Sequence, residues 1–174
     1  MKFTILALLP FLSLFALMAA AQGGVAQYIS TLVTSIESLK TQLHQPQVGQ
    51  SYSAALRVNQ ATQGLVRSLQ SATTFLNQHG QLSSTEASQV LDNMKKSLPI
   101  VKDATTTVAA LKTDFQRLGL VGIARSDVLK LQAATQAFTQ SVVDNTPGTY
   151  AAQAKHRQQE YNAALASAAA AYSP

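Results

Sequence analysis

The sequence predicts an all-α protein: a single bundle of five helices, preceded by a cleaved signal peptide. Apolar residues recur every three or four positions through nearly all of the chain after residue 24, which is the spacing of one helix face. The segments between these runs are short and rich in proline, glycine and capping residues. We therefore expect one helical domain over residues 22–174, with consecutive helices as antiparallel neighbours.

The first two helices are predicted over about residues 25–43 and 51–78. Pro46 and Gly49 end the first, because neither residue favours continuation of a helix. His79-Gly80 marks the end of the second, since glycine readily adopts the backbone conformation that closes a helix. Tyr52, near the start of the second helix, is expected to face inward with its apolar stripe.

The third helix has the clearest start, because Ser83 and Glu86 have the spacing of a capping box. Its apolar stripe continues as far as Gly119. Pro99 lies inside and removes one backbone hydrogen bond. Because the stripe keeps its phase across the proline, we expect a kink at Pro99, near residues 95–98, and not two helices.

The last two helices are predicted over about residues 121–144 and 147–172. Thr146-Pro147 separates them, with Thr146 as the expected cap of the final helix and Pro147 at its first position.

Residues 1–21 have the order of a secretory signal peptide. Lys2 supplies the positive charge, an apolar run follows, and Ala19, Ala20 and Ala21 are small residues suited to cleavage after Ala21. An uncleaved signal anchor is the alternative, since a spanning helix needs about 20 apolar residues. Pro10 and the alanine ending favour cleavage. With no later membrane segment, we expect a secreted, extracellular protein.

Composition excludes several classes of protein. Loss of Lys2 leaves 12 of the 13 basic residues beside 8 acidic ones, a net charge of +4. These basic residues are scattered, so no nucleic-acid partner is expected. The chain contains no cysteine. An exported chain without disulfides must be stabilised by burial of its core alone.

No arrangement of residues indicates catalysis. The sequence lacks a nucleophile elbow, a phosphate-binding glycine loop and zinc-ligand spacing. His156 and Glu160 share a helix face, but two ligands are too few for a metal site. We therefore expect a protein that is not an enzyme and needs no metal or cofactor.

Large and small apolar residues alternate along the predicted inner faces. This texture fits either close helix packing or a slot between helices that is wide enough for an acyl chain. About a dozen buried methylenes at ~0.8 kcal/mol each would offset an association cost of ~4 kcal/mol or more. The candidate lining residues are Leu69, Phe75, Met94, Leu111, Phe115, Leu131 and Phe138. The candidate head-group contacts are Lys95, Lys96 and Lys102.

Several motifs together resemble one family. They are Gly80-Gln81-Leu82-Ser83 before the third helix, the Lys112, Phe115 and Gly119 ending, the helix with Leu129, Leu131 and Phe138, and the Thr146-Pro147 step. This pattern is similar to the fungal hydrophobic surface-binding protein A family, which includes the Mp1-like cell-wall galactomannoproteins.

The resemblance implies a secreted or wall-associated helical domain without catalytic residues. Some members adsorb to hydrophobic surfaces and recruit secreted hydrolases, and others enclose a fatty acid between helices. Three functions stay open: a carrier of a long-chain fatty acid or other lipid, an adsorbing protein whose bundle opens on a surface, and a structural or antigenic cell-wall mannoprotein that binds proteins or polysaccharide.

Overall fold

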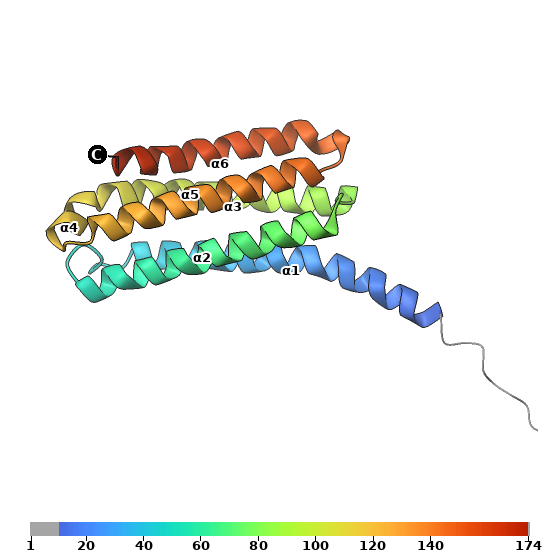
Figure 1. Ribbon diagram of the computed structural model, residues 1–174, viewed down its shortest axis with the longest axis horizontal. Helices are drawn as coiled ribbons and strands as arrows, with labels where there is room; N and C mark the ends of the chain where they lie inside the picture. Colours follow the sequence, from blue (N-terminus) through green and yellow to red (C-terminus); the bar gives the residue numbers. More distant parts are fainter. Residues whose placement is uncertain (1–10, 174) are drawn as a thin grey trace, which may run out of the picture.

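The computed structural model describes residues 11–173, with side chains from residue 24 onward (Figure 1). Its elements are α1 (Phe11–Leu43), α2 (Tyr52–His79), α3 (Ser84–Ala110), α4 (Lys112–Arg117), α5 (Val121–Asn145), a 3₁₀ turn (Gly148–Tyr150) and α6 (Ala151–Ala171). This part of the chain contains no β-strand, so the prediction of an all-α bundle is confirmed.

The predicted signal peptide is only partly covered. Residues 1–10 lie outside the described residues, and residues 11–21 form the first turns of α1. The expected cleavage point after Ala21 therefore lies within the helix, and cleavage stays a prediction. Within the described chain, no helix combines the length and the hydropathy needed to cross a membrane.

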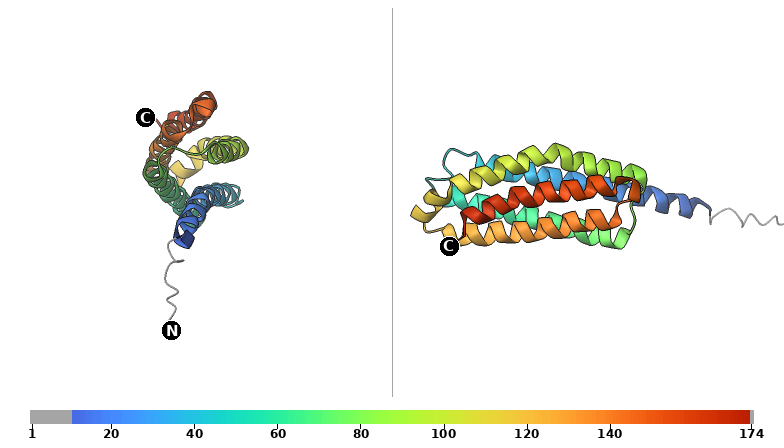
Figure 2. Two further views of the ribbon diagram at one scale, coloured as in Figure 1. Left: turned by 90° about the vertical axis from the view of Figure 1, so that its right-hand side faces the viewer. Right: turned by 90° about the horizontal axis from the view of Figure 1, so that it is seen from above.

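The five long helices lie along a common axis (Figure 2). Their packing forms a closed ring in the order α1, α2, α5, α6, α3 and back to α1. The expectation that consecutive helices are neighbours is correct for α1–α2 and α5–α6, but wrong for α3, whose main partners are α1 and α6. The α2–α3 connection crosses the end of α5, where the Leu82 N–H donates to the Asn145 carbonyl at 2.8 Å. A ring allows every long helix to bury its apolar face against a shared centre.

The predicted third helix is one helix through Pro99 but two elements further on. Pro99 lies inside α3, and the angle of the expected kink stays a prediction. α3 ends at Ala110, and α4 follows after Leu111. The Leu111 N–H is shared between the Thr107 and Val108 carbonyls at 3.1 and 3.2 Å, which tightens the last turn. The β-branched run before this turn weakens the helix, and the bundle gains a short sixth helix.

The predicted cap of α3 is confirmed. The Ser83 N–H donates to Glu86 Oε2 at 2.9 Å, and the Glu86 N–H donates to Ser83 Oγ at 3.3 Å. The predicted cap of the last helix is wrong, because the Thr146 hydroxyl donates back to the Val142 carbonyl at 2.6 Å. Pro147 instead precedes the 3₁₀ turn, and α6 begins at Ala151.

The predicted inward position of Tyr52 is also wrong. Its side chain is 55% exposed at the first position of α2. The helix face next to it turns inward at Ala54 and Ala55, which are buried. The core along the axis is otherwise continuous, and apolar residues from all five long helices contribute to it.

Candidate functional site

Two small apolar cavities lie one after the other along the axis of the ring. The first has a volume of ≈ 50 Å³ and is lined by residues of all five long helices, from Ile29 of α1 to Leu165 of α6. The second, of ≈ 40 Å³, lies beside it toward Val108 and Val128. Their walls are almost entirely aliphatic and aromatic, so the cavities suit an apolar occupant.

A single layer of side chains separates the two cavities. Five residues line both of them, and each belongs to a different long helix. We call them the waist layer: Ile36 of α1, Leu65 of α2, Val101 of α3, Leu131 of α5 and Leu165 of α6. Movement of these five side chains would join the cavities into one slot along the bundle axis.

Four of the seven predicted lining residues meet at the first cavity. They are Leu69, Met94, Leu131 and Phe138. Phe115 is buried elsewhere, beside a small void that also contacts Leu120 and Asp127.

The remaining two predicted residues lie outside the lining of both axial cavities. Leu111 is only partly buried and packs against the core at the α3–α4 break. The Phe75 ring stacks on Tyr28, with ring centroids 4.4 Å apart, and on His79, at 5.4 Å. It lies so close to Gly24 that a Cβ there would approach its ring to 2.8 Å.

The lining residues predicted from the sequence include none from α1 or α6, although both helices line the cavities. Ile29, Leu32, Val33 and Ile36 line the cavities from α1, and Tyr161 and Leu165 line the first from α6. The signal for α1 was present in its regular apolar stripe. Nothing local distinguished these residues from ordinary core residues.

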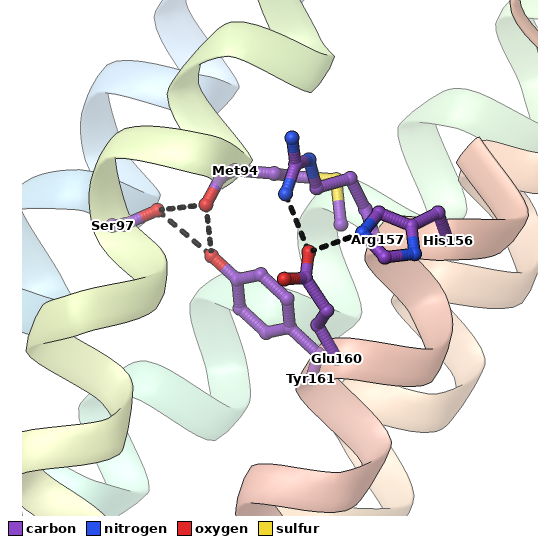
Figure 3. Close-up of polar contacts among 6 residues, drawn as sticks. All are labelled: Met94, Ser97, His156, Arg157, Glu160 and Tyr161. Atoms are coloured by element: carbon purple, nitrogen blue, oxygen red, sulfur yellow. Dashed lines mark hydrogen bonds and ion pairs between the residues drawn. The ribbon is translucent and has the colours of Figure 1, made fainter. Parts of the chain in front are cut away.

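The Tyr161 hydroxyl beside the first cavity already has hydrogen-bonding partners (Figure 3). The Tyr161 hydroxyl donates to the Met94 carbonyl at 2.9 Å and lies 2.9 Å from Ser97 Oγ. Burial raises the pKa of Tyr161 to about 12. Arg157 and His156 pair with Glu160 one turn away on α6. The Tyr161 hydroxyl therefore joins α6 to α3, and it is not an unpaired group waiting for a ligand.

The three predicted head-group lysines face solvent. Lys95, Lys96 and Lys102 are all exposed on α3, and none lines either axial cavity. A carboxylate inside the ring would have no contact with them in this arrangement of the helices.

One end of the ring is closed by a stack of aromatic and charged side chains. Beyond Tyr28 and Phe75, His79 Nε2 lies 3.5 Å from Glu86 Oε1. Burial alone would raise the pKa of Glu86, but hydrogen bonds from Ser83 and the nearby His79 outweigh burial and lower it. Glu86 therefore acts as an ionised cap that ties α2 to the start of α3.

No part of the described chain gathers the ligands of a metal site. His156 and Glu160 lie 3.7 Å apart on α6, the histidine exposed and the glutamate half-buried, and no group of three or more potential ligands occurs among the described residues.

Comparison with solved structures places the fold beside those of lipid complexes. AfMp4p in complex with palmitic acid superposes with a TM-score of 0.80 at 22% identity, covering 87% of this chain and 99% of that one. Ligand binding domain 1 of Penicillium marneffei MP1 protein, complexed with arachidonic acids, gives 0.76 at 13%, covering 86% and 96%. Domain 2 of the same protein, also with arachidonic acids, gives 0.76 at 15%, covering 98% of each chain. At these identities the likeness shows a shared fold.

The sequence comparison gives the family. No curated protein matches the chain. A family model described as hydrophobic surface binding protein A matches residues 20–144, which is most of the chain and covers all of α2 and α3 and most of α1 and α5. The chain therefore belongs to the hydrophobic surface binding protein A family.

Proposed function

We propose that this protein is a non-catalytic carrier that binds a long-chain fatty acid, or a similar lipid, in the apolar centre of the helix ring. The observation that carries the proposal is the pair of axial cavities separated only by the waist layer. The shared fold with the palmitic and arachidonic acid complexes supports it.

The length of the two cavities suits an acyl chain. Both are lined by α5, from Val128 beside the second to Phe138 beside the first. This stretch of helix rises ~15 Å. One leaflet of a bilayer, half of a hydrocarbon core ~30 Å thick, accommodates an acyl chain over a similar distance. A chain lying along the axis would therefore contact both cavities and pass through the waist layer.

The volume requires the ring to expand. Cavities of ≈ 50 and ≈ 40 Å³ are together smaller than the ~150 Å³ cavity that admits benzene in a protein core. A fatty acid must therefore displace waist-layer side chains and separate neighbouring helices. Burial of about a dozen methylenes, at ~0.8 kcal/mol each, supplies the free energy for this expansion. The absence of disulfides leaves the helices free to move, since the chain has no cysteine.

The test compares two leucines on the same helix. Leu131 is in the waist layer, whereas Leu129 is 47% exposed. We expect L131Q to reduce the affinity for cis-parinaric acid, a fluorescent fatty acid, by at least tenfold, and L129Q to leave it unchanged. Circular dichroism confirms that both variants are folded. Failure of the unmutated protein to bind cis-parinaric acid, together with a lipid-free extract by mass spectrometry, would overturn the proposal.

We also propose that the domain is exported after cleavage at Ala21 and acts outside the cell, free or associated with the cell wall. The signal-like order of residues 1–21 supports this. Amino-terminal sequencing of protein recovered from culture medium and from a wall fraction tests it. Retention of Met1 in the recovered protein would contradict cleavage.

Adsorption to hydrophobic surfaces is the second candidate, and the family match favours it. In the described chain the exposed large apolar side chains are Tyr52, Ile123 and Leu129. Three such residues make a small contact area, so strong adsorption would need the ring to open and expose its core.

The test of adsorption uses the close contact of Ser35 with Ser68, whose hydroxyl oxygens lie 2.9 Å apart between α1 and α2, and that of Asn77 with Ser141 between α2 and α5. Disulfides at both pairs should reduce depletion by hydrophobic beads. Equal depletion with and without these disulfides would exclude opening as the mechanism.

The possible partners are tested separately. Washing the loaded beads with culture medium tests recruitment of secreted hydrolases. A pull-down with wall polysaccharide tests binding to the polysaccharide.

A further inference from the structure

A groove of ≈ 430 Å³ lies on the outside of the ring between α1 and α3. Three of its lining residues, Ile29 and Val33 of α1 and Asn93 of α3, also line the first axial cavity. These three side chains are therefore shared between the groove, which opens to solvent, and the apolar interior.

The seam between α1 and α3 has few polar contacts. Among the described residues, its only side-chain hydrogen bond is His44 Nε2 to Asp103 Oδ2 at 2.7 Å, an exposed pair far along the seam from the groove. Three of the other sides have buried or part-buried side-chain hydrogen bonds, whereas the α5–α6 side has the exposed pair of Gln158 and Gln140 at 2.8 Å. Examples are Ser35 to Ser68 between α1 and α2, and Tyr161 to Ser97 between α6 and α3.

The backbone of α3 is also weakened on this side. Pro99 has no N–H to donate to the Lys95 carbonyl, which removes one bond from the helix ladder. A second open groove adjoins Pro99 and Ile100 of α3, Lys40 of α1 and His44, which directly follows α1. Both grooves thus follow the same seam, and α3 can bend there at a lower cost than an uninterrupted helix.

The rim of the first groove has the chemistry to hold a carboxylate. Its floor is apolar, whereas Ser30 and Thr34 of α1 and Gln89 and Asn93 of α3 provide polar side chains. Thr34 donates to the Ser30 carbonyl at 3.0 Å, and the Asn93 amide donates to the Gln89 carbonyl at 2.8 Å. Within the described chain, the Ser30 hydroxyl and the Gln89 amide make no such bond and are exposed. Both are therefore donors available to an anionic oxygen.

We propose that this groove is the portal and head-group site for the ligand. The acyl chain passes between Ile29, Val33 and Asn93 into the first cavity, and the carboxylate stays in the groove, where Ser30 and Gln89 donate to it. This inference rests on the proposed fatty-acid function and adds to it the side of the ring that opens and the residues that recognise the acid.

The first experiment cross-links α1 to α3 with a disulfide. V33C/N93C in this cysteine-free chain joins α1 to α3 at the groove. Stopped-flow uptake of cis-parinaric acid should slow at least tenfold in the oxidised variant and recover on reduction. The control S35C/S68C, which joins α1 to α2 across a 2.9 Å contact, should take up the acid equally fast in both states. Equal rates for oxidised and reduced V33C/N93C would overturn the portal.

A variant that needs no disulfide gives an independent reading. V33F should narrow the portal and slow both the uptake and the release of cis-parinaric acid. V66F, at a partly buried residue of α2 that lines neither axial cavity, is the matched control. Unchanged kinetics in V33F would contradict the portal even if the cross-link fails to form.

The head-group site is tested by comparing an acid with its ester. In S30A/Q89L the affinity for palmitic acid should fall about tenfold, whereas the affinity for methyl palmitate should not change. An equal fall for both ligands, or no fall for either, would exclude these two residues as carboxylate donors. Failure of the unmutated protein to bind either ligand would overturn the proposed function itself. Normal binding by the unmutated protein, with no effect of the cross-link or of these substitutions, would overturn the portal and head-group site alone.

Discussion

The two sides of α3 differ in how they are joined to the rest of the ring. Toward α6, Tyr161 bonds to Met94 and Ser97, and the Tyr172 hydroxyl donates to the Val108 carbonyl at 2.9 Å. Toward α1, the described residues show one exposed ion pair and two open grooves. The helix is thus held firmly on one side and by apolar packing on the other. A bundle with one weak seam can open there without losing its fold, which the proposed entry of an acyl chain would require.

The largest expected effect on stability is at the contact between α3 and α6. Y161A removes a buried aromatic ring and both of its hydrogen-bonding contacts, so the free energy of unfolding should fall by about 3–5 kcal/mol. Urea unfolding measures it, and Y52A, at a tyrosine that is 55% exposed, should change stability by less than about 0.5 kcal/mol. Similar losses in the two variants would remove the distinction between the sides of α3.

A smaller change isolates the hydroxyl. Y161F keeps the aromatic ring and should lower the free energy of unfolding by about 1 kcal/mol at neutral pH. Burial raises the pKa of Tyr161 to about 12, above its value of ~10 in the unfolded chain. The folded state favours the protonated phenol. The contribution of this group to the free energy of unfolding is therefore fully present below pH ~10 and is lost as the pH rises through 12.

The alkaline loss should therefore be shallower in Y161F than in the unmutated protein. Burial also raises the pKa of Tyr172 to about 12, so part of the loss should persist until Y172F is added. An unchanged alkaline limb in Y161F would contradict this account of the hydroxyl.

The buried carboxyl group of Asp127 on α5 tests how the contact between α2 and α5 contributes to stability, for comparison with the contact between α3 and α6. Burial raises its pKa, although the Asn59 amide, at 2.6 Å, and the charge of Lys130 act in the opposite direction. A raised carboxyl pKa means that ionisation destabilises the fold, so stability falls as the pH rises through the folded pKa. D127N should be more stable than the unmutated protein at pH 7 and converge with it in acid. The pH dependence of urea unfolding measures this, and D144N, at an exposed aspartate on the same helix, should show no such difference.

The smallest expected effect on stability is at the seam between α1 and α3. His44 and Asp103 are 47% and 43% exposed, and such pairs contribute about 0–1 kcal/mol. H44A should therefore change thermal stability little, and less again in high salt. A loss above about 2 kcal/mol would show that the α1–α3 seam is held by this pair and is not the side that opens.

Some features followed from the order of residues alone. The bounds of α2 and the start of α3 were predicted to within about one residue, because the 3.6-residue spacing and the Ser83–Glu86 capping box are local. The family could be identified from short motifs, and the match over residues 20–144 agrees. Errors arose where distant contacts decided the outcome, as at Tyr52, whose place on a helix stripe did not reveal what covered it.

The tertiary structure decided the site. Leu131 and Leu111 each lie next to a lysine on an apolar helix stripe, yet Leu131 lies in the waist layer and Leu111 lies at the α3–α4 break. The waist layer takes one residue from each long helix, and the α1–α3 groove joins residues about sixty positions apart. Periodicity assigns each helix an inner face, but it does not say which helices are neighbours, since every apolar face could pack against several others. The ring order, and with it the weak seam between α1 and α3, exists only once the chain has folded.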